Sequence, residues 1–271
     1  MSTLLPDLRY ALRMLRKNPG FTAVAVLTLA LGIGANTAIF SVVNAVLLRP
    51  LGYPEPDRIV QFMVRNQDGE GIELTSIPVF MVWRGQTQVL QDFALYEAEG
   101  PISAGVQELY KAAGVNLTGG DRPERLRSIH VSADFFRLFG APVEIGRTFT
   151  AQEDIPGGPR VVVISDGLWR LRFHADRSLV GKTILLGGEP HVVIGVLGPS
   201  FRTDAPSDIW LPSRADPNSI DHTFPWRAAA RLRPGVTLEM AKAQTKLAAA
   251  QFRQKFPNAV SSDNFDLFLT S

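Results

Sequence analysis

Histidine is the residue type in this chain best suited to acid–base or metal chemistry near neutral pH. The four histidines are His130, His174, His191 and His222, and they lie far apart in the sequence. A zinc site usually takes its ligands at short spacings, such as His-x-x-x-His with a carboxylate nearby. Because no such spacing occurs, we predict packed or surface positions for these side chains and no metal site.

Carboxylates and nucleophiles give no better support for catalysis. Glu153 and Asp154 precede the sequence Pro-Gly-Gly-Pro, so we predict a solvated turn in which the two neighbouring carboxylates point apart. The chain has no cysteine, which excludes thiol catalysis and iron–sulfur clusters. It also has no G-x-S-x-G elbow and no P-loop. We therefore predict a protein that is not an enzyme and that binds no cofactor.

The dominant feature of the chain is an apolar segment, residues 21–48, without a single Asp, Glu, Lys or Arg. A helix needs roughly 20 apolar residues to cross a bilayer core, so this segment is long enough to be a transmembrane helix. A cleaved signal peptide is the alternative. It fits less well, because the segment is about twice as long as the apolar region of a signal peptide and no small-residue cleavage site follows it.

Charged residues beside this segment predict its orientation. Arg9, Arg13, Arg16 and Lys17 precede it, whereas the charges that follow it nearly cancel. Positive charges near a span stay in the cytoplasm, so we predict a single-pass protein of the cell inner membrane with a cytoplasmic N-terminus. Residues 1–20 have the pattern of an amphipathic helix that lies on membrane lipid, and residues 51–271 would form a periplasmic core.

Small and polar residues within the apolar segment suggest that it packs against other helices. Ala30, Gly34 and Ala38 recur every four residues, which lets a second helix approach closely. Asn36 and Asn44 add hydrogen-bonding groups that are costly in lipid unless they are paired. The alternative is a plain anchor whose polar side chains bond to their own backbone.

The rest of the composition is that of an exported globular region. The net charge of +2 is small and no basic stripe with interleaved aromatic residues occurs, which argues against nucleic acid as a partner. Phe135, Phe136 and Phe139 are expected to lie in the core. Trp226 follows His-Thr-Phe-Pro at a crossover between subdomains, and it is the candidate for a partner contact.

Periodicity predicts an α+β fold with two βαβ-like units. Each unit is a strand, a helix and a strand, at 58–65, 78–90 and 93–97, and again at 227–233, 237–256 and 265–269. In the second unit Arg227, Arg231 and Arg233 alternate with apolar residues along the strand, and Thr237 is placed to cap the helix. Two such units predict a split ferredoxin-like, porter-like subdomain made of residues 55–114 and 212–271.

A β-rich lobe, residues 115–211, is inserted between the two units. Its strands are predicted at 161–164, 182–186, 191–197 and 208–211. Ser165 and Asp166 offer an N-cap for a helix that ends at Phe173.

Several motifs in this order resemble one family of membrane proteins. They are Ala-Ile-Phe-Ser-Val-Val-Asn-Ala-Val-Leu-Leu-Arg-Pro-Leu at 38–51, Tyr-Pro-Glu-Pro-Asp-Arg at 53–58, Arg-Pro-Glu-Arg-Leu-Arg at 122–127, Val-Ser-Ala-Asp-Phe-Phe at 131–136, Gly-Arg-Thr-Phe at 146–149, Val-Ile-Ser-Asp-Gly-Leu-Trp at 163–169 and Leu-Arg-Pro-Gly-Val-Thr at 232–237. Together they resemble the MacB-like periplasmic core of ABC transporter permeases, most closely the acidobacterial duplicated orphan permease subgroup.

The resemblance implies a role without bond chemistry. Permeases of this type work with a cytoplasmic ABC ATPase subunit in trans, with other permease transmembrane segments and as a homo- or hetero-dimer, in transport or in transmission of motion across the membrane. Family permeases continue with an FtsX-like transmembrane block, and this chain stops where that block would begin, so we expect a truncated permease. The alternative is a single-span extracytoplasmic interaction or adaptor module that does not itself transport.

Overall fold

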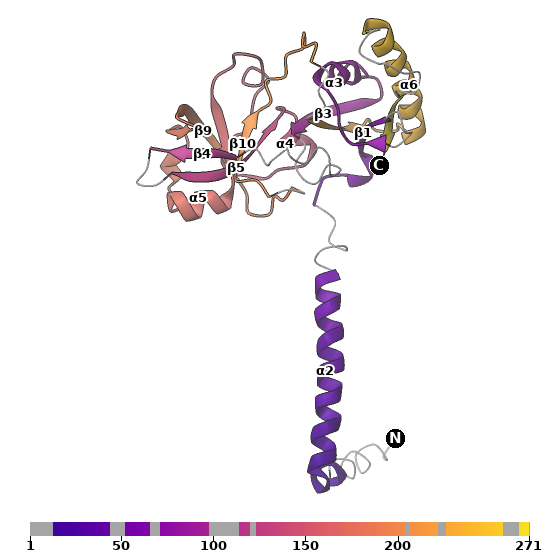
Figure 1. The fold of residues 1–271 in the computed structure, drawn as a ribbon, viewed down its shortest axis with the longest axis vertical. Helices are drawn as coiled ribbons and strands as arrows, with labels where there is room; N and C mark the ends of the chain where they lie inside the picture. Colours follow the sequence, from indigo (N-terminus) through magenta and orange to yellow (C-terminus); the bar gives the residue numbers. More distant parts are fainter. Residues whose placement is uncertain are drawn as a thin grey trace. The chain divides into compact units, whose positions relative to one another are not determined.

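The computed structural model describes residues 13–43, 52–65, 71–97, 114–119, 123–203, 206–221, 226–256 and 266–270. The chain divides into two compact units, residues 1–51 and 52–271. The first unit contains the apolar helix and the second contains the core, and each is described by itself (Figure 1).

The apolar segment forms a helix, α2 (Pro19–Val43). Asn18 separates it from a short helical stretch at residues 13–17, as the Asn-Pro-Gly sequence predicts. Within the described residues, the window Pro19–Thr37 has a mean hydropathy of 1.5, is not buried in the chain, and is long and apolar enough to cross a membrane. A signal sequence near an N-terminus has the same character, so the helix fits either a membrane anchor or a secretion signal.

One half of the core is a four-stranded antiparallel sheet with two helices. Its elements in chain order are β1 (Ile59–Arg65), α3 (Ile77–Arg84), β3 (Leu90–Glu97), β11 (Trp226–Leu232), α6 (Leu238–Lys255) and β12 (Asp266–Thr270). The strands lie in the order β3-β11-β1-β12, and the short β2 (Gly71–Ile72) pairs with β1. In each βαβ unit the second strand is therefore separated from the first by another strand, which is a split βαβ arrangement.

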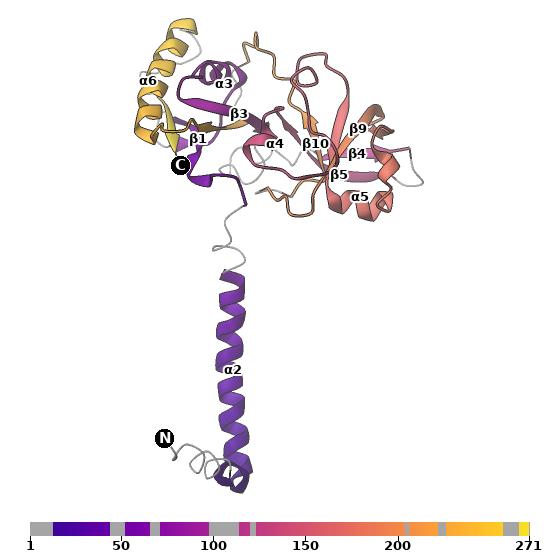
Figure 2. The ribbon, with the colours of Figure 1, turned by 180° about the vertical axis from the view of Figure 1, so that it is seen from behind.

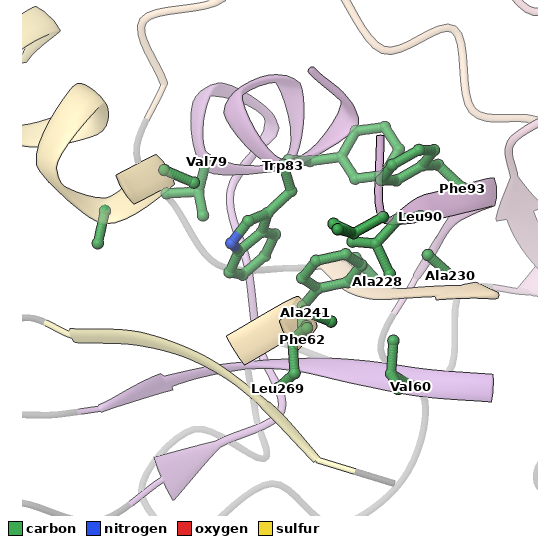
Figure 3. Packing of buried hydrophobic residues seen from close by; sticks show 14 of the residues in the cluster. Val60, Phe62, Val79, Trp83, Leu90, Phe93, Ala228, Ala230, Ala241 and Leu269 are labelled. Atoms are coloured by element: carbon green, nitrogen blue, oxygen red, sulfur yellow. The ribbon is translucent and has the colours of Figure 1, made fainter. Parts of the chain in front are cut away.

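The apolar core of this half lies between the sheet and the two helices, which Figures 1 and 2 show near the same strands. Phe62 of β1 stacks on Trp83 of α3 with ring centroids 4.3 Å apart (Figure 3). Helix α6 contributes the small residues Ala241 and Ala248, both fully buried, so its backbone approaches the sheet closely.

The first predicted helix was too long. We expected it to reach Leu90, but α3 ends at Arg84 and Gly85 is its C-cap. Hydrogen-bonded turns at Gln86 then lead into β3, which begins at Leu90 rather than at Phe93. Leu90 is buried in the same core as Phe93, so the apolar residues that extended the helical pattern belong to a turn and a strand.

The other half of the core is a small closed barrel of six strands. These are β4 (Gly114–Thr118), β5 (Glu124–Val131), β7 (Val161–Ile164), β8 (Thr183–Leu186), β9 (Glu189–Leu197) and β10 (Ile209–Pro212). Neighbours pair in the order β5-β10-β7-β9-β8-β4, and β4 pairs with β5 again, which closes the ring. The pairs β5–β10 and β7–β9 are parallel. A further strand, β6 (Val143–Gly146), pairs with β9 outside the ring.

Side chains fill the barrel, because one apolar cluster draws residues from every strand of the ring. They include Leu117, Leu126, Val162, Ile184, Val193 and Ile209. Helix α5 (Asp166–Phe173) contributes Leu168 and Trp169 to the same cluster. Its predicted cap is confirmed, since the Ser165 hydroxyl accepts a hydrogen bond of 3.1 Å from the Leu168 amide.

The two halves share one sheet and one further cluster. Strand β3 pairs with β5 at Tyr96 and Val131, so the sheet is continuous through both halves. Helix α4 (Phe135–Leu138) packs against β3, and its two phenylalanines are buried, as predicted. The cluster around α4 includes Ala94 and Ala229 from the four-stranded half and Val161 and Trp210 from the barrel.

The Phe62–Trp83 stack is expected to be the most costly single contact to remove from the four-stranded half. Trp83→Ala should lower the free energy of unfolding by about 3–5 kcal/mol, because it leaves a large cavity. Chemical denaturation measures the change. Leu171→Ala is the control, because this side chain is 85% exposed and its loss should change stability little. Similar effects of the two substitutions would contradict the assigned packing.

Candidate functional site

The segment Gly52–Arg58, called here the exit segment, follows the apolar helix in the chain and is bound to the core. The ring of Tyr53 packs on Phe139 with centroids 4.8 Å apart. Pro54 lies against Gly140 so closely that a Cβ at this glycine would come within 2.4 Å of the proline ring. Gly140 also has φ +64°, a conformation that favours glycine. The exit segment therefore packs against the turn that follows α4.

The end of the exit segment is fixed to β11. Pro56–Arg58 forms a 3-10 turn, and the Arg58 guanidinium donates hydrogen bonds of 3.1 and 2.5 Å to the carbonyl oxygen of Leu232. The same guanidinium pairs with Glu55 at 2.5 Å. The exit segment is thus held at both ends, by aromatic contact near α4 and by hydrogen bonds to β11.

The exit segment packs against a cluster of aromatic rings. Phe135 lies 4.8 Å from Phe139, and Phe136 lies 5.3 Å from Phe149 and 6.3 Å from Trp210 between ring centroids. This cluster is the one shared by the two halves of the core. The exit segment therefore packs against the cluster that the two halves share.

Four of the predicted helix-packing residues, Ala30, Gly34, Asn36 and Ala38, lie on α2. Ala30, Gly34 and Asn36 are exposed, and a Cβ placed on Gly34 would meet nothing within 4 Å. The backbone of Ala38 is helical, but its side chain and all of Asn44 lie outside the described residues. Their packing against other helices stays a prediction.

Trp226, the predicted partner contact, lies at the start of β11. It is half-buried and packs against the core of the four-stranded half. Its carbonyl oxygen accepts a hydrogen bond of 2.7 Å from the Thr75 amide. Packing within the core explains the half-buried position of Trp226. Its contact with a partner stays a prediction.

The described histidines do not gather into a site. The Nδ1 atom of His130 lies 2.9 Å from Glu97, in an ion-pair geometry between β5 and β3. Burial lowers the pKa of His191, whose Nδ1 lies 3.0 Å from the Glu189 carbonyl oxygen. Across the described ranges, no group of three His, Cys, Asp or Glu side chains is arranged to hold a metal ion.

Glu153 and Asp154 do point apart, and the Pro-Gly-Gly-Pro turn that follows them is largely exposed, as predicted. The two carboxylates, however, are engaged in hydrogen bonds. Glu153 is buried, receives hydrogen bonds of 2.8 and 2.7 Å from Arg147, and accepts another from the Thr150 amide. Asp154 accepts hydrogen bonds from the Ser213 hydroxyl and from two backbone amides. These carboxylates fasten the loop before β7 to neighbouring segments. The pattern Thr-x-x-Glu at 150–153 was the signal for this local hydrogen bonding.

A cleft of about 640 Å³ opens between α5, the start of β5 and the segment before β10. Arg127 and Asp208 on its wall form a bidentate ion pair at 2.8 and 3.1 Å. Burial raises the pKa of Asp208, but the hydrogen bonds from Arg127 outweigh this effect and hold it below its ordinary value. Arg172 lies 3.7 Å from Glu124 on the same wall. Since these charges neutralise one another, we assign no ligand to the cleft.

Comparison with known proteins decides the family. Residues 22–248 match the MacB-like periplasmic core domain, which is most of the chain. The chain belongs to this family. The helix and core together are those of a membrane-anchored or secreted extracytoplasmic domain, and the MacB-like periplasmic core is a non-catalytic module.

Solved structures with the same fold share little sequence with this chain. A domain assigned to a permease from Porphyromonas gingivalis has a TM-score of 0.57 and 15% identity, covering 80% of this chain and 92% of that one. The periplasmic region of MacB from Actinobacillus actinomycetemcomitans has a TM-score of 0.52 and 14% identity, covering 79% and 88%. The extracellular domain of the ABC-type transporter YknZ from Gram-positive bacteria has a TM-score of 0.51 and 16% identity, covering 79% and 100%.

Among curated proteins, the chain is similar to the macrolide export ATP-binding/permease protein MacB of Escherichia coli strain K12. The two are 35% identical over 85 residues, which is 30% of this chain and 13% of that protein. The matched part is thus a small fraction of the relative's length.

The pair formed by buried Glu153 and exposed Arg147 predicts a stability effect that depends on pH. Hydrogen bonds from Arg147 lower the pKa of Glu153 from 4.5 to about 2, although burial opposes them. The folded pKa is depressed, so the stabilisation is present above pH 4.5 and is lost as the pH falls toward 2. Glu153→Gln should cost about 2 kcal/mol of unfolding free energy at pH 7, a value reduced for the partial exposure of Arg147, and almost nothing near pH 2.

Urea denaturation at the two pH values measures this difference. The control is Glu189→Gln, which breaks the exposed pair with Arg160 and should cost less than about 1 kcal/mol at either pH. A cost for Glu153→Gln that is the same at pH 7 and pH 2 would contradict the assigned pairing.

Proposed function

We propose that this chain is the membrane-anchored periplasmic core of a MacB-type ABC permease. It does no bond chemistry, and it takes part in transport or in transmission of motion across the inner membrane. A cytoplasmic ABC ATPase subunit acts in trans, and further permease transmembrane segments and a second core, as a homo- or hetero-dimer, complete the assembly. In this proposal α2 is the single span, with the N-terminus in the cytoplasm.

The observation that carries this proposal is the packing of the exit segment on the core. Tyr53 and Pro54 pack on the turn after α4 and Arg58 bonds to β11, so the segment with which the core begins is fixed to it. A displacement that enters along the chain at Gly52 therefore reaches both halves of the core directly. We assign the four-stranded half as the porter-like subdomain and the barrel as the inserted lobe.

A second observation supports an assembly with other helices. Exposed Ala30 and Gly34 lie on α2, spaced four residues apart, and small residues at this spacing allow close helix approach. In lipid, the exposed side chain of Asn36 favours a partner that can hydrogen-bond to it.

The test is purification of the full chain from its own membranes, with a tag after Ser271 and cross-linking before detergent is added. We expect an ABC ATPase and a further membrane-spanning permease chain to co-purify. Gly34→Leu should reduce their recovery, because the larger side chain blocks close approach. Gly32→Leu is the matched control, since Gly32 lies on another side of α2 and has equally open surroundings.

A chain that crosses the membrane at normal abundance and is recovered without ATPase or permease partners would contradict the proposal. That result would favour the alternative, a single-span interaction or adaptor module.

A further inference from the structure

Arg231 on β11 is a buried arginine beneath the exit segment. The residue is 4% exposed, and its side chain lies on the face of the sheet opposite the apolar core of the four-stranded half. It donates hydrogen bonds of 2.5 Å to the carbonyl oxygen of Pro54 and of 2.5 Å to that of Leu138. A third, longer contact of 3.4 Å reaches the carbonyl oxygen of Glu55. One guanidinium thus joins the exit segment, β11 and the end of α4.

Asp92 is the carboxylate that faces this guanidinium. It lies 3.4 Å from Nε of Arg231 and 2.7 Å from Nε of Arg137. Its φ of +53° falls in the left-handed region, which is rare for a residue other than glycine. The pairing of β3 with β11 shifts register at this point, between Ala94 and Gln91 on β3. Such a bulge re-aims a side chain, and here it brings Asp92 to the side of Arg231.

Together these groups form a chain of alternating charge from α4 to the exit segment. Its members in order are Asp134, Arg137, Asp92, Arg231, Glu55 and Arg58. The successive ion-pair distances are 3.0, 2.7, 3.4, 3.7 and 2.5 Å. Among these six residues only Arg231 is deeply buried. Leaving a buried charge without partners is costly, so the position of this side chain is tightly constrained by the groups it bonds to.

We propose that Arg231, held by Asp92, is the coupling residue that locks the exit segment to the four-stranded half of the core and to the end of α4. This inference rests on the proposed function, in which motion reaches the core through that segment. The apolar contacts of Tyr53 and Pro54 give the segment its place, and the directional bonds of Arg231 fix its orientation. Without the guanidinium the three carbonyl oxygens lose their donor, while the apolar cores of the two halves keep their contacts.

The absence of cysteine makes a direct distance measurement practical. Two doubly labelled forms of the full chain in lipid nanodiscs carry a spin label at Gly52→Cys. The second label is at Glu144→Cys on β6 in one form and at Glu239→Cys on α6 in the other, and all three positions are exposed. Pulsed electron resonance then reports the distance from the exit segment to each half of the core.

Both distances should be narrowly distributed in the parent chain. Arg231→Met should abolish the narrow peak in both forms, and Asp92→Asn, a milder change, should broaden both. Asp208→Asn is the matched control, since it disrupts the bidentate pair with Arg127 in the barrel, away from the exit segment. It should leave both peaks narrow. Thermal melts of each variant check that the core remains folded, and Asp92→Asn serves as the test if Arg231→Met does not fold.

Narrow peaks in a folded Arg231→Met or Asp92→Asn chain would overturn the proposal. Equal broadening by Asp208→Asn would also overturn it, because the effect would then follow from the loss of any buried or half-buried carboxylate. The measurement needs no ATPase, so it can fail while the proposed transport role stands, and it can succeed where no ATPase partner is found.

Discussion

The arrangement of the exit segment depends on the hydrogen bonds and the ion pair that the buried guanidinium of Arg231 makes. A charge that is 4% exposed must find partners within the protein, and here they are backbone oxygens of the exit segment and of α4 together with Asp92. These partners come from segments that are far apart in the sequence. If the exit segment moved away, buried N–H groups of Arg231 would lose their acceptors at Pro54 and Glu55, and this cost disfavours such an arrangement.

The rest of the core provides a rigid setting for this contact. The four-stranded half packs its own apolar core against α3 and α6, and the barrel fills its interior with side chains from each strand of the ring. The aromatic cluster around α4 occupies the space where the halves meet. Because close-packed interiors deform little, this cluster and the two apolar cores give the exit segment a firm surface to pack on.

Local signals in the sequence predicted much of this fold. The caps at Ser165 and Thr237 and the strand at Val161–Ile164 are confirmed, because each depends on residues next to one another in the chain. The resemblance to MacB-like cores is confirmed at the level of the family.

Features that depend on distant residues were missed. The first half of strand β5, which holds Glu124, Arg125 and Arg127, was not predicted as a strand. The barrel closes through the pairing of β5 with β10, some 80 residues further on, which no local pattern reveals. The bulge at Asp92 and the burial of Arg231 are equally non-local. The only hint of the latter was the alternation of Arg227 and Arg231 with apolar residues along β11, a pattern that does not show which arginine is buried.

Hydrogen exchange at the exit segment tests the central claim most directly. In the full chain the amides of Arg58 and Ile59 bond to the carbonyl oxygens of Glu55 and Pro56 in the turn before β1. If the segment is locked to the core, these amides should exchange as slowly as those of the buried strand β11 and should open only with it. Exchange at the rate of an unprotected tether, while β11 stays protected, would contradict this account.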